Sequence, residues 1–365
     1  MKKVKGLRIA AAAGLALTVT ATPLLGGTHS ANAARRQAAS GTVGFLFSDF
    51  TTSARWEFDK SYYEAALKAL DPNVSVSIKD ATNDQTQQAN QARSLLTTGA
   101  KVLIDVPVDS AQAAAIVRLA HANSPKVPVI AYDRLIQGAP VDAYTTFDGF
   151  SVGAQQAKYL IAHVKKGGSI VSIAGASTDN NAILFHAGAM SVIQPLVKQS
   201  VYKLVYDKYT PKWDNNTGQA EMAAALTQNK NKVDGVLVAN DGLAGGVIAA
   251  LKAQGLAGKI PVTGQDATIA GFQQILLGNQ SMTIYKPLKL LASAAAKVTD
   301  AFLNHKMYTF PTTTDNGAGK IPTVLLPVTT VTKANIKSTV IKDGFIKRSD
   351  ICVAQTEAAC KALGI

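Results

Sequence analysis

The sequence predicts an α/β protein with two doubly wound lobes, each a parallel sheet covered by helices on both faces. The length of 365 residues suits two domains of ordinary size. Short apolar runs alternate with helical segments of ten or more residues, which is typical of parallel sheets. One strand–helix–strand unit also occurs twice. Because 47% of the residues are apolar and 17% are charged, the chain can bury large cores, and wholesale disorder is excluded.

The first 33 residues are expected to be a secretory signal peptide. Four basic residues precede an apolar run at 9–19, and residues 31–33 (ANA) match the pattern that signal peptidase reads. An uncleaved N-terminal anchor is the alternative. Lipidation is not expected, because Thr28 follows the apolar run where a lipoprotein needs cysteine. The protein is therefore expected in the periplasm or at the extracellular face of the cytoplasmic membrane.

The first lobe is predicted to begin with the apolar strand 42–47. An amphipathic helix, an alternating strand, a helix that starts near Asp84, a buried strand and an alanine-rich helix follow in turn. In chain order these elements and the next two apolar runs lie at 56–70, 74–79, 84–97, 102–106, 110–122, 127–132 and 143–147.

The same alternation continues in the second predicted lobe, where helices of ten or more residues again separate short apolar strands. The strands are expected near 169–174, 202–206, 233–239 and 260–264. The helices are expected near 152–164, 181–198, 217–229, 243–254 and 267–277.

The repeated unit places two aspartates at equivalent positions. Residues 101–133 and 233–266 both consist of a strand, an aspartate, a helix, a proline and a strand that ends in aspartate. The closing aspartates are Asp133 and Asp266. Ligands of open α/β sheets bind beyond the carboxyl ends of the strands. We therefore expect these two carboxylates to face one ligand from two lobes.

Composition excludes several classes of function. The formal net charge of +13 falls to +9 without residues 1–33, but the lysines are dispersed and form no arginine-rich stripe, so nucleic acid is not expected as a partner. The five histidines show no metal-ligand spacing, and two cysteines are too few for a cysteine-rich zinc site, so no metal is expected. No phosphate-binding glycine loop or nucleophile elbow occurs, and no cofactor is expected.

Polar motifs along nearly the whole mature chain resemble those of the periplasmic sugar-binding proteins of ABC importers. The similarity is to the D-xylose-binding branch and to its multiple-sugar-binding relatives. Because the motifs occur in the family's order, the set is more specific than any one of them. The motifs are 53–56 (SARW), 131–136 (AYDRLI), 178–182 (TDNNA), 239–242 (ANDG), 264–267 (GQDA), 285–287 (YKP) and 340–345 (VIKDGF).

This resemblance implies two lobes joined by a hinge of three crossing segments, with the ligand in the cleft between them. It places the N-terminal lobe at 41–146 plus 285–323, the C-terminal lobe at 147–284 plus 324–350, and a tail at 351–365. It implies that sugar contacts come from both lobes. Carried over motif by motif, the ligand-binding residues are Arg55, Trp56, Asp133, Arg134, Asp179, Asn181, Trp213, Asn240, Asp266 and Lys286.

The chemistry of these residues suits a neutral polyol. Aspartate accepts hydrogen bonds from hydroxyls, arginine donates through a planar fork, and asparagine does both. Three basic residues balance three acidic ones, so a bound sugar leaves no large unpaired charge. A tryptophan face covers the C–H face of a sugar ring. The segment 213–217 (WDNNT) is closer to the multiple-sugar branch, whereas 285–287 is closer to the xylose branch, so the sugar itself stays open.

Each of these residues also has a purely structural interpretation. Asp133 and Asp266 would serve as helix N-caps, and Asp179 would cap the helix that follows it. Arg134 would form a surface ion pair. Trp56 and Trp213 would be core aromatics. Asp241, in a favourable turn sequence, is expected to be structural.

Three classes of function remain in view. The first is a non-enzymatic receptor that binds D-xylose or a related aldose and delivers it to an ABC permease, acting as a monomer, with a chemoreceptor as a further candidate partner. The second is a secreted sugar-acting enzyme in which Asp133 and Asp266 flank the scissile bond. The third is a sugar-responsive regulator of the same fold. The signal segment disfavours the regulator, whose class carries an N-terminal helix-turn-helix.

The C-terminal tail lies outside the family pattern. Because Cys352 and Cys360 are eight positions apart in an exported chain, we expect them to form a disulfide. We expect truncation at Ile351 to leave sugar binding intact.

Overall fold

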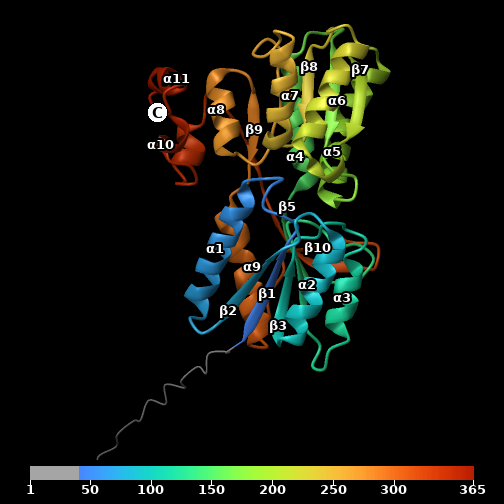
Figure 1. The fold of residues 1–365 in the computed structure, drawn as a ribbon, viewed down its shortest axis with the longest axis vertical. Coiled ribbons are helices and arrows are strands. Elements are labelled where there is room, and N and C mark those ends of the chain that lie inside the picture. Colours follow the sequence, from blue (N-terminus) through green and yellow to red (C-terminus); the bar gives the residue numbers. More distant parts are fainter. Residues whose placement is uncertain (1–40) are drawn as a thin grey trace, which may run out of the picture. The chain divides into compact units, whose positions relative to one another are not determined.

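The computed structural model describes residues 41–365, so the expected signal segment lies outside the described residues. Two larger sheets of mainly parallel strands organise this part of the chain (Figure 1). The seven-stranded sheet defines what is called here the first lobe, and the three-stranded sheet defines the second lobe. The predicted residue boundaries of the two lobes remain a proposal.

The first lobe is built on a seven-stranded sheet with the order β10-β11-β5-β4-β3-β1-β2. All neighbouring strands are parallel except β10, which pairs antiparallel with β11. The strands are β1 (Thr42–Phe47), β2 (Ser75–Asp80), β3 (Ala100–Asp105), β4 (Val129–Tyr132), β5 (Ala143–Phe147), β10 (Thr312–Asp315) and β11 (Lys320–Leu326).

Alternation along β1 shows how both faces of this sheet are covered. Phe45 and Phe47 point into one core with helices α1 (Arg55–Leu70) and α9 (Leu288–Leu303). Leu46 points to the opposite face and packs in a core with α2 (Gln85–Thr97) and α3 (Ala114–His121). All three side chains are buried. The continuous apolar sequence of β1 is thus the result of burial on both faces.

The second lobe has the strand order β7-β6-β8 in a parallel sheet. Two pairs of helices flank it: α4 with α5, and α6 with α7. Gly153 and Gly188 allow α4 and α5 to touch, since a side chain at either position would overlap the backbone of the other helix. The elements are β6 (Ser169–Ala174), β7 (Lys203–Tyr209), β8 (Gly235–Val238), α4 (Gly149–His163), α5 (Asn180–Lys198), α6 (Asn215–Gln228) and α7 (Asp241–Ala253).

Three segments connect the two sheets. The chain leaves the first sheet after Phe147 and enters α4, returns from β9 (Met282–Tyr285) into α9, and leaves again from β11 into β12 (Thr329–Thr332). Strands β9 and β12 pair antiparallel beside the second lobe. The predicted two-lobed α/β fold with three crossings is therefore confirmed.

Most predicted elements are present within a few residues of their expected bounds, but the strand at 260–264 was wrong. Only Val262 forms a β-bridge there, with Val236. Val236 still makes backbone hydrogen bonds with Pro261 and Thr263. At Val238 the hydroxyl of Thr263 accepts from the backbone N–H and donates to the carbonyl, so there a side chain replaces backbone pairing. The helix predicted at 110–122 begins at Ala114, and none of the helices and strands after Leu277 was predicted.

The tail at 351–365 is folded against the rest of the protein. It follows α10 (Arg348–Ile351) and contains α11 (Glu357–Ala362), and a disulfide joins Cys352 to Cys360 with a Cα–Cα distance of 5.9 Å. Ile351 and Cys360 are fully buried in the core that also contains α8 (Ile269–Leu277). The side-chain amide of Gln273 on α8 donates to the carbonyl of Asp350. Figure 1 shows α10 and α11 beside α8.

Within residues 41–365, none of the helices is long and apolar enough to cross a membrane.

Candidate functional site

All ten predicted ligand-binding residues line one cavity. They come from the amino end of α1, the loops after β4 and β6, the start of α5, the turn before α6, the amino end of α7 and the segments around β9. The cavity is also lined by four residues that were not predicted: Thr52, Ser53, Phe185 and Gln265. Three of these four are within or next to the motifs at 53–56 and 264–267, which is the signal that could have identified them.

Both of the repeated aspartates have a positive backbone φ angle. Asp133 follows β4 and has a φ of 61°, and Asp266 has a φ of 92°. Left-handed backbone conformations are costly for residues other than glycine and are typical of functional sites. Neither aspartate caps a helix among the described elements, and Thr268 is the N-cap of α8. The N-cap interpretation of these two residues was wrong.

Arg55 holds Asp133 in its ionised form. Its Nη1 lies 2.8 Å from Asp133 Oδ2 and 4.0 Å from Asp266 Oδ1, while its Nε lies 2.8 Å from Asp59 Oδ2. Burial raises the pKa of Asp133, but the attractions of Arg55, Lys286 and Arg134 outweigh it, so the pKa lies below its usual value. Tyr132 donates to Asp59 Oδ1 at 2.6 Å and thereby helps to orient Arg55.

Asp179 serves both as a helix cap and as part of the cavity wall. Its side chain accepts from the backbone N–H of Asn181 at the start of α5. Its Oδ2 lies 2.9 Å from Nε of Arg134 and accepts from the indole N–H of Trp213 at 3.1 Å. Arg134 is buried, so its predicted alternative as a surface ion pair was wrong.

Several contacts at the cavity join the two lobes directly. Asn181 Nδ2 donates to Asp133 Oδ1 at 2.9 Å, and Ser53 Oγ donates to Asp266 Oδ2 at 2.8 Å. Arg134 and Asp179 form an ion pair across the same boundary. Lys286 lies in the crossing after β9, with Nζ 3.3 Å from Asp266 Oδ1. Asn240 caps α7 through its Oδ1.

Aromatic side chains form the remaining walls. The guanidinium of Arg55 lies 4.4 Å from the centre of the Trp56 ring, and that of Arg134 lies 5.5 Å from it. Lys286 Nζ lies 5.2 Å from the centre of the Phe185 ring. Trp56 and Trp213 are buried and belong to the apolar cores, as the core interpretation predicted, and they also line the cavity.

The open volume between these side chains is about 20 Å³. The cavity has little open volume because polar groups of the two lobes bond directly to each other across it. Two buried polar atoms of the lining have no hydrogen-bond partner in the described structure: the indole N–H of Trp56 and Oε1 of Gln265. They are one donor and one acceptor that the described residues leave without a partner.

Asp241 is structural, as predicted. It does not line the cavity, and its carboxylate accepts from the backbone and hydroxyl of Thr268, from Gln280 and from Thr283. It thereby ties the amino end of α7 to the loop that carries Asp266. The residues from 41 onward contain no cluster of metal-ligating side chains.

Comparison with known proteins agrees with this architecture. The family described as periplasmic binding protein domain matches residues 43–307. The chain belongs to this family. It is 38% identical over 309 residues to the D-xylose-binding periplasmic protein of Escherichia coli K12, and the aligned region covers 85% of this chain and 92% of that protein. It is 33% identical to the multiple sugar-binding periplasmic receptor ChvE of Rhizobium radiobacter, and here the aligned region covers 96% of this chain and all of that protein.

A solved structure supports the same family. The carbohydrate transporter solute binding protein from Chloroflexus aurantiacus, in complex with D-glucose, superposes with a TM-score of 0.76 at 32% identity, over 85% of this chain and 97% of that one. The predicted resemblance to both sugar-binding branches is therefore confirmed. Because this is a family of binding proteins, the chain belongs to a non-enzymatic class, and the alternative of a secreted enzyme was wrong.

Proposed function

We propose that the protein is an extracytoplasmic receptor that captures a monosaccharide, D-xylose or a related aldose, and delivers it to an ABC-type sugar permease. One observation carries the proposal: three basic and three acidic side chains from both lobes converge on one buried cavity with two asparagines and two tryptophans. A balanced set of this kind hydrogen-bonds a neutral polyol without leaving a buried charge unpaired.

The contacts between the lobes suggest how the sugar is held. Sugar hydroxyls would take the place of the Ser53–Asp266 and Asn181–Asp133 hydrogen bonds and would then bridge the same groups. The indole N–H of Trp56 and Oε1 of Gln265 would gain partners. Charge-assisted hydrogen bonds to sugar hydroxyls are stronger than neutral ones, so the ligand stabilises the closed form.

Relatives support both the sugar class and the range of candidate sugars. The E. coli relative is named for D-xylose, the R. radiobacter relative for multiple sugars, and the C. aurantiacus structure contains D-glucose. We therefore place D-xylose first and D-glucose second for this chain.

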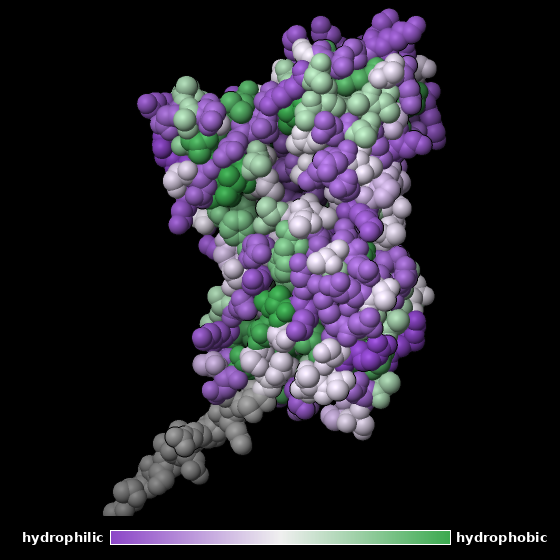
Figure 2. Space-filling model, in the orientation of Figure 1, coloured by the Kyte–Doolittle hydropathy of each residue, from purple (hydrophilic) through white to green (hydrophobic). Residues whose placement is uncertain are grey.

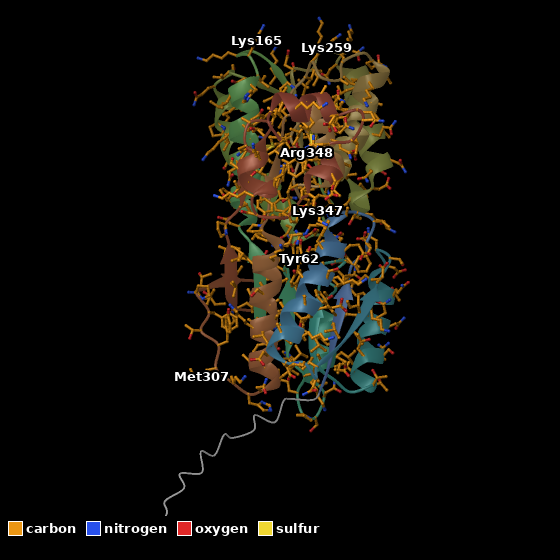
Figure 3. The ribbon with its side chains drawn as sticks, turned by 90° about the vertical axis from the view of Figure 1, so that its left-hand side faces the viewer. Tyr62, Lys165, Lys259, Met307, Lys347 and Arg348 are labelled. Atoms are coloured by element: carbon orange, nitrogen blue, oxygen red, sulfur yellow. A yellow bond between two sulfur atoms is a disulfide. The ribbon has the colours of Figure 1, made fainter. Side chains whose placement is uncertain are left out.

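Titration calorimetry of the mature chain with D-xylose, D-glucose, D-galactose, L-arabinose and D-ribose tests the proposal. The matched variants are Lys286→Met, which removes a buried cation 3.3 Å from Asp266, and Lys259→Met, which removes an exposed one. In Figure 3 Lys259 lies at the far end of the second lobe. We expect binding of at least one aldose that Lys286→Met weakens at least about tenfold, the loss of one charge-assisted hydrogen bond. Binding of none of these sugars, or equal binding by both variants, would contradict the proposal.

A further inference from the structure

A second and larger space adjoins the sugar cavity. Its volume is about 390 Å³, against about 20 Å³ for the sugar cavity, and it falls within the range of ligand pockets. Both spaces are lined by Thr52, Ser53, Arg55 and Asp266. The two spaces are therefore neighbours that share one wall, and this second space is called the side chamber below.

One side of the side chamber is aromatic and aliphatic. Phe58 on α1 and Phe345, in the segment before α10, have ring centres 5.7 Å apart at an interplanar angle of 47°. Ile269 and Ala270, in the first turn of α8, lie beside them. Figure 2 shows hydrophobic surface in the region where α8 and the C-terminal segment approach α1, and Figure 3 shows Tyr62, one turn further along α1 from Phe58, below Lys347.

The other side of the chamber is polar but nearly free of available charge. Thr51, Asn215 and Gln273 line it with a hydroxyl and two amides. The Thr51 hydroxyl already donates to Asp49, and the Gln273 amide already donates to the carbonyl of Asp350. Oδ1 of Asn215 is buried and has no hydrogen-bond partner within residues 41–365. The carboxylate of Asp241 is already used by Thr268, Gln280 and Thr283. This lining suits a neutral molecule with an apolar face and polar edges.

A sugar ring has this character, because its C–H face packs on aromatic rings while its hydroxyls bond to amides. The shared wall contains the hydrogen bond from Ser53 to Asp266, two groups able to donate to and accept from an oxygen substituent. Resting on the proposed function, we propose that the side chamber is a second saccharide subsite. The protein then binds a disaccharide with one ring in the sugar cavity and the second ring in the side chamber.

A third space, of about 360 Å³, lies on another side of the sugar cavity and provides an internal control. It is lined by the charged side chains of Asp84, Asp109, Arg134 and Lys212. The only residues that it shares with the sugar cavity are Arg134 and Trp213. The proposal assigns the second ring to the chamber with Phe58 and Phe345 and not to this charged space.

Two substitutions distinguish the spaces. Ala270 is exposed and lines the side chamber, and Ser177 is exposed and lines the charged space. Neither residue lines the sugar cavity. Ala270→Trp therefore fills the side chamber with an indole ring, and Ser177→Trp fills the other space, while both leave the residues of the sugar cavity unchanged.

The experiment is calorimetric titration of the wild type, Ala270→Trp and Ser177→Trp with D-xylose, D-glucose, xylobiose, cellobiose and maltose. We expect the wild type to bind at least one disaccharide. Ala270→Trp should weaken that binding at least about tenfold, or 1.4 kcal/mol, and change monosaccharide binding less than about twofold. Ser177→Trp should change neither.

The alternative outcomes separate this proposal from the proposed function. Binding of a monosaccharide but of no disaccharide overturns the second subsite and leaves the receptor function standing. Disaccharide binding that survives Ala270→Trp, or that only Ser177→Trp abolishes, also overturns it, as does loss of monosaccharide and disaccharide together in Ala270→Trp. Binding of a disaccharide with no monosaccharide supports the subsite and contradicts the function as proposed.

Discussion

At Gly175 the backbone passes so close to the indole of Trp213 that no side chain fits. A Cβ at this position would lie 2.2 Å from the ring atoms Cη2 and Cζ2 of Trp213. The ring also donates through its Nε1 to Asp179 at 3.1 Å, so the indole is held from two sides. Gly175→Ala must therefore displace the ring from the cavity wall, although it removes no polar contact.

We expect Gly175→Ala to weaken sugar binding at least about tenfold and to change the tryptophan fluorescence of the protein. The loss follows from the apolar contact area that a displaced ring no longer offers to a sugar. Gly245→Ala is the matched control, because a Cβ there meets nothing within 4 Å and the position is inside α7. The control should bind sugar normally and gain slightly in stability. Equal affinity of the two variants would show that Trp213 does not contact the sugar.

A second residue-scale prediction concerns Asp105, at the end of β3. Its side chain is fully buried, and neither carboxylate oxygen has a hydrogen-bond partner in the described structure. Burial raises its pKa to about 8 from an ordinary 3.8, even though Arg134 attracts the charged form. The folded protein therefore binds a proton here that the unfolded chain releases above about pH 4.

The sign of the effect on stability follows from linkage. Because the pKa is higher in the folded state, this group stabilises the fold fully below about pH 4 and loses that contribution as the pH rises toward 8. The slope is at most about 1.4 kcal/mol per pH unit for one proton. We expect Asp105→Asn to reduce the fall in the free energy of unfolding between pH 5 and 8, measured by urea denaturation. Asp241, whose pKa burial raises to about 7, should keep part of the slope. Parallel curves for wild type and variant would show that Asp105 titrates normally.

At the scale of elements, the tail was expected from the sequence to be dispensable for binding. The structure nevertheless predicts that its removal lowers the stability of the protein. Ile351 and Cys360 are buried in the core that includes α8, and α8 follows the loop that carries Asp266. Truncation at Ile351 uncovers apolar side chains of this core. We expect a clear fall in melting temperature, and sugar affinity that is normal when measured well below that temperature.

Removal of the disulfide is also expected to lower the melting temperature, by less than truncation does. It closes a loop of eight residues, and constraining such a loop in the unfolded chain stabilises by roughly 2–3 kcal/mol. Cys352→Ser with Cys360→Ser should lower the melting temperature without changing the sugar affinity by more than about twofold. A lower affinity in the double variant at low temperature would mean that the tail positions Asp266 through α8.

Elements with strong local signals could be predicted from the sequence, and those defined by long-range contacts could not. Helix α2 was recognised because Asp84 caps it, and β1 because its apolar run is buried on both faces. Strands β9 and β12 were missed because they are short and pair with each other from distant parts of the chain. The ten site residues could be named because each is in a motif that resembles the family. Phe185 could not, because nothing in its helical sequence distinguishes a side chain at the cavity from one in the core.

At the scale of the whole molecule, polar pairs at the cavity decide whether the two lobes stay together. Ser53 to Asp266, Asn181 to Asp133, and Arg134 to Asp179 all join groups from different lobes. Three connecting segments allow hinge motion, as in other two-lobed proteins that close around ligands. A sugar favours the closed form only through the additional contacts that it makes there. How far the ligand shifts the lobes toward the closed form therefore depends on the residues of both lobes that contact it.

Asp266 gives the sharpest test of this closure. Asp266→Ala removes the acceptor of Ser53, the partner of Lys286 and one of the carboxylates near Arg55. It leaves the ion pair between Arg55 and Asp133 in place. We expect the variant to fold, to lose at least about tenfold in affinity, and to show no ligand-induced decrease in radius of gyration by small-angle scattering. Wild-type affinity with normal compaction would show that Asp266 supports only the backbone turn in which it lies. Because Asp266 also lines the side chamber, disaccharide binding should fall together with monosaccharide binding, whereas Ala270→Trp should separate them.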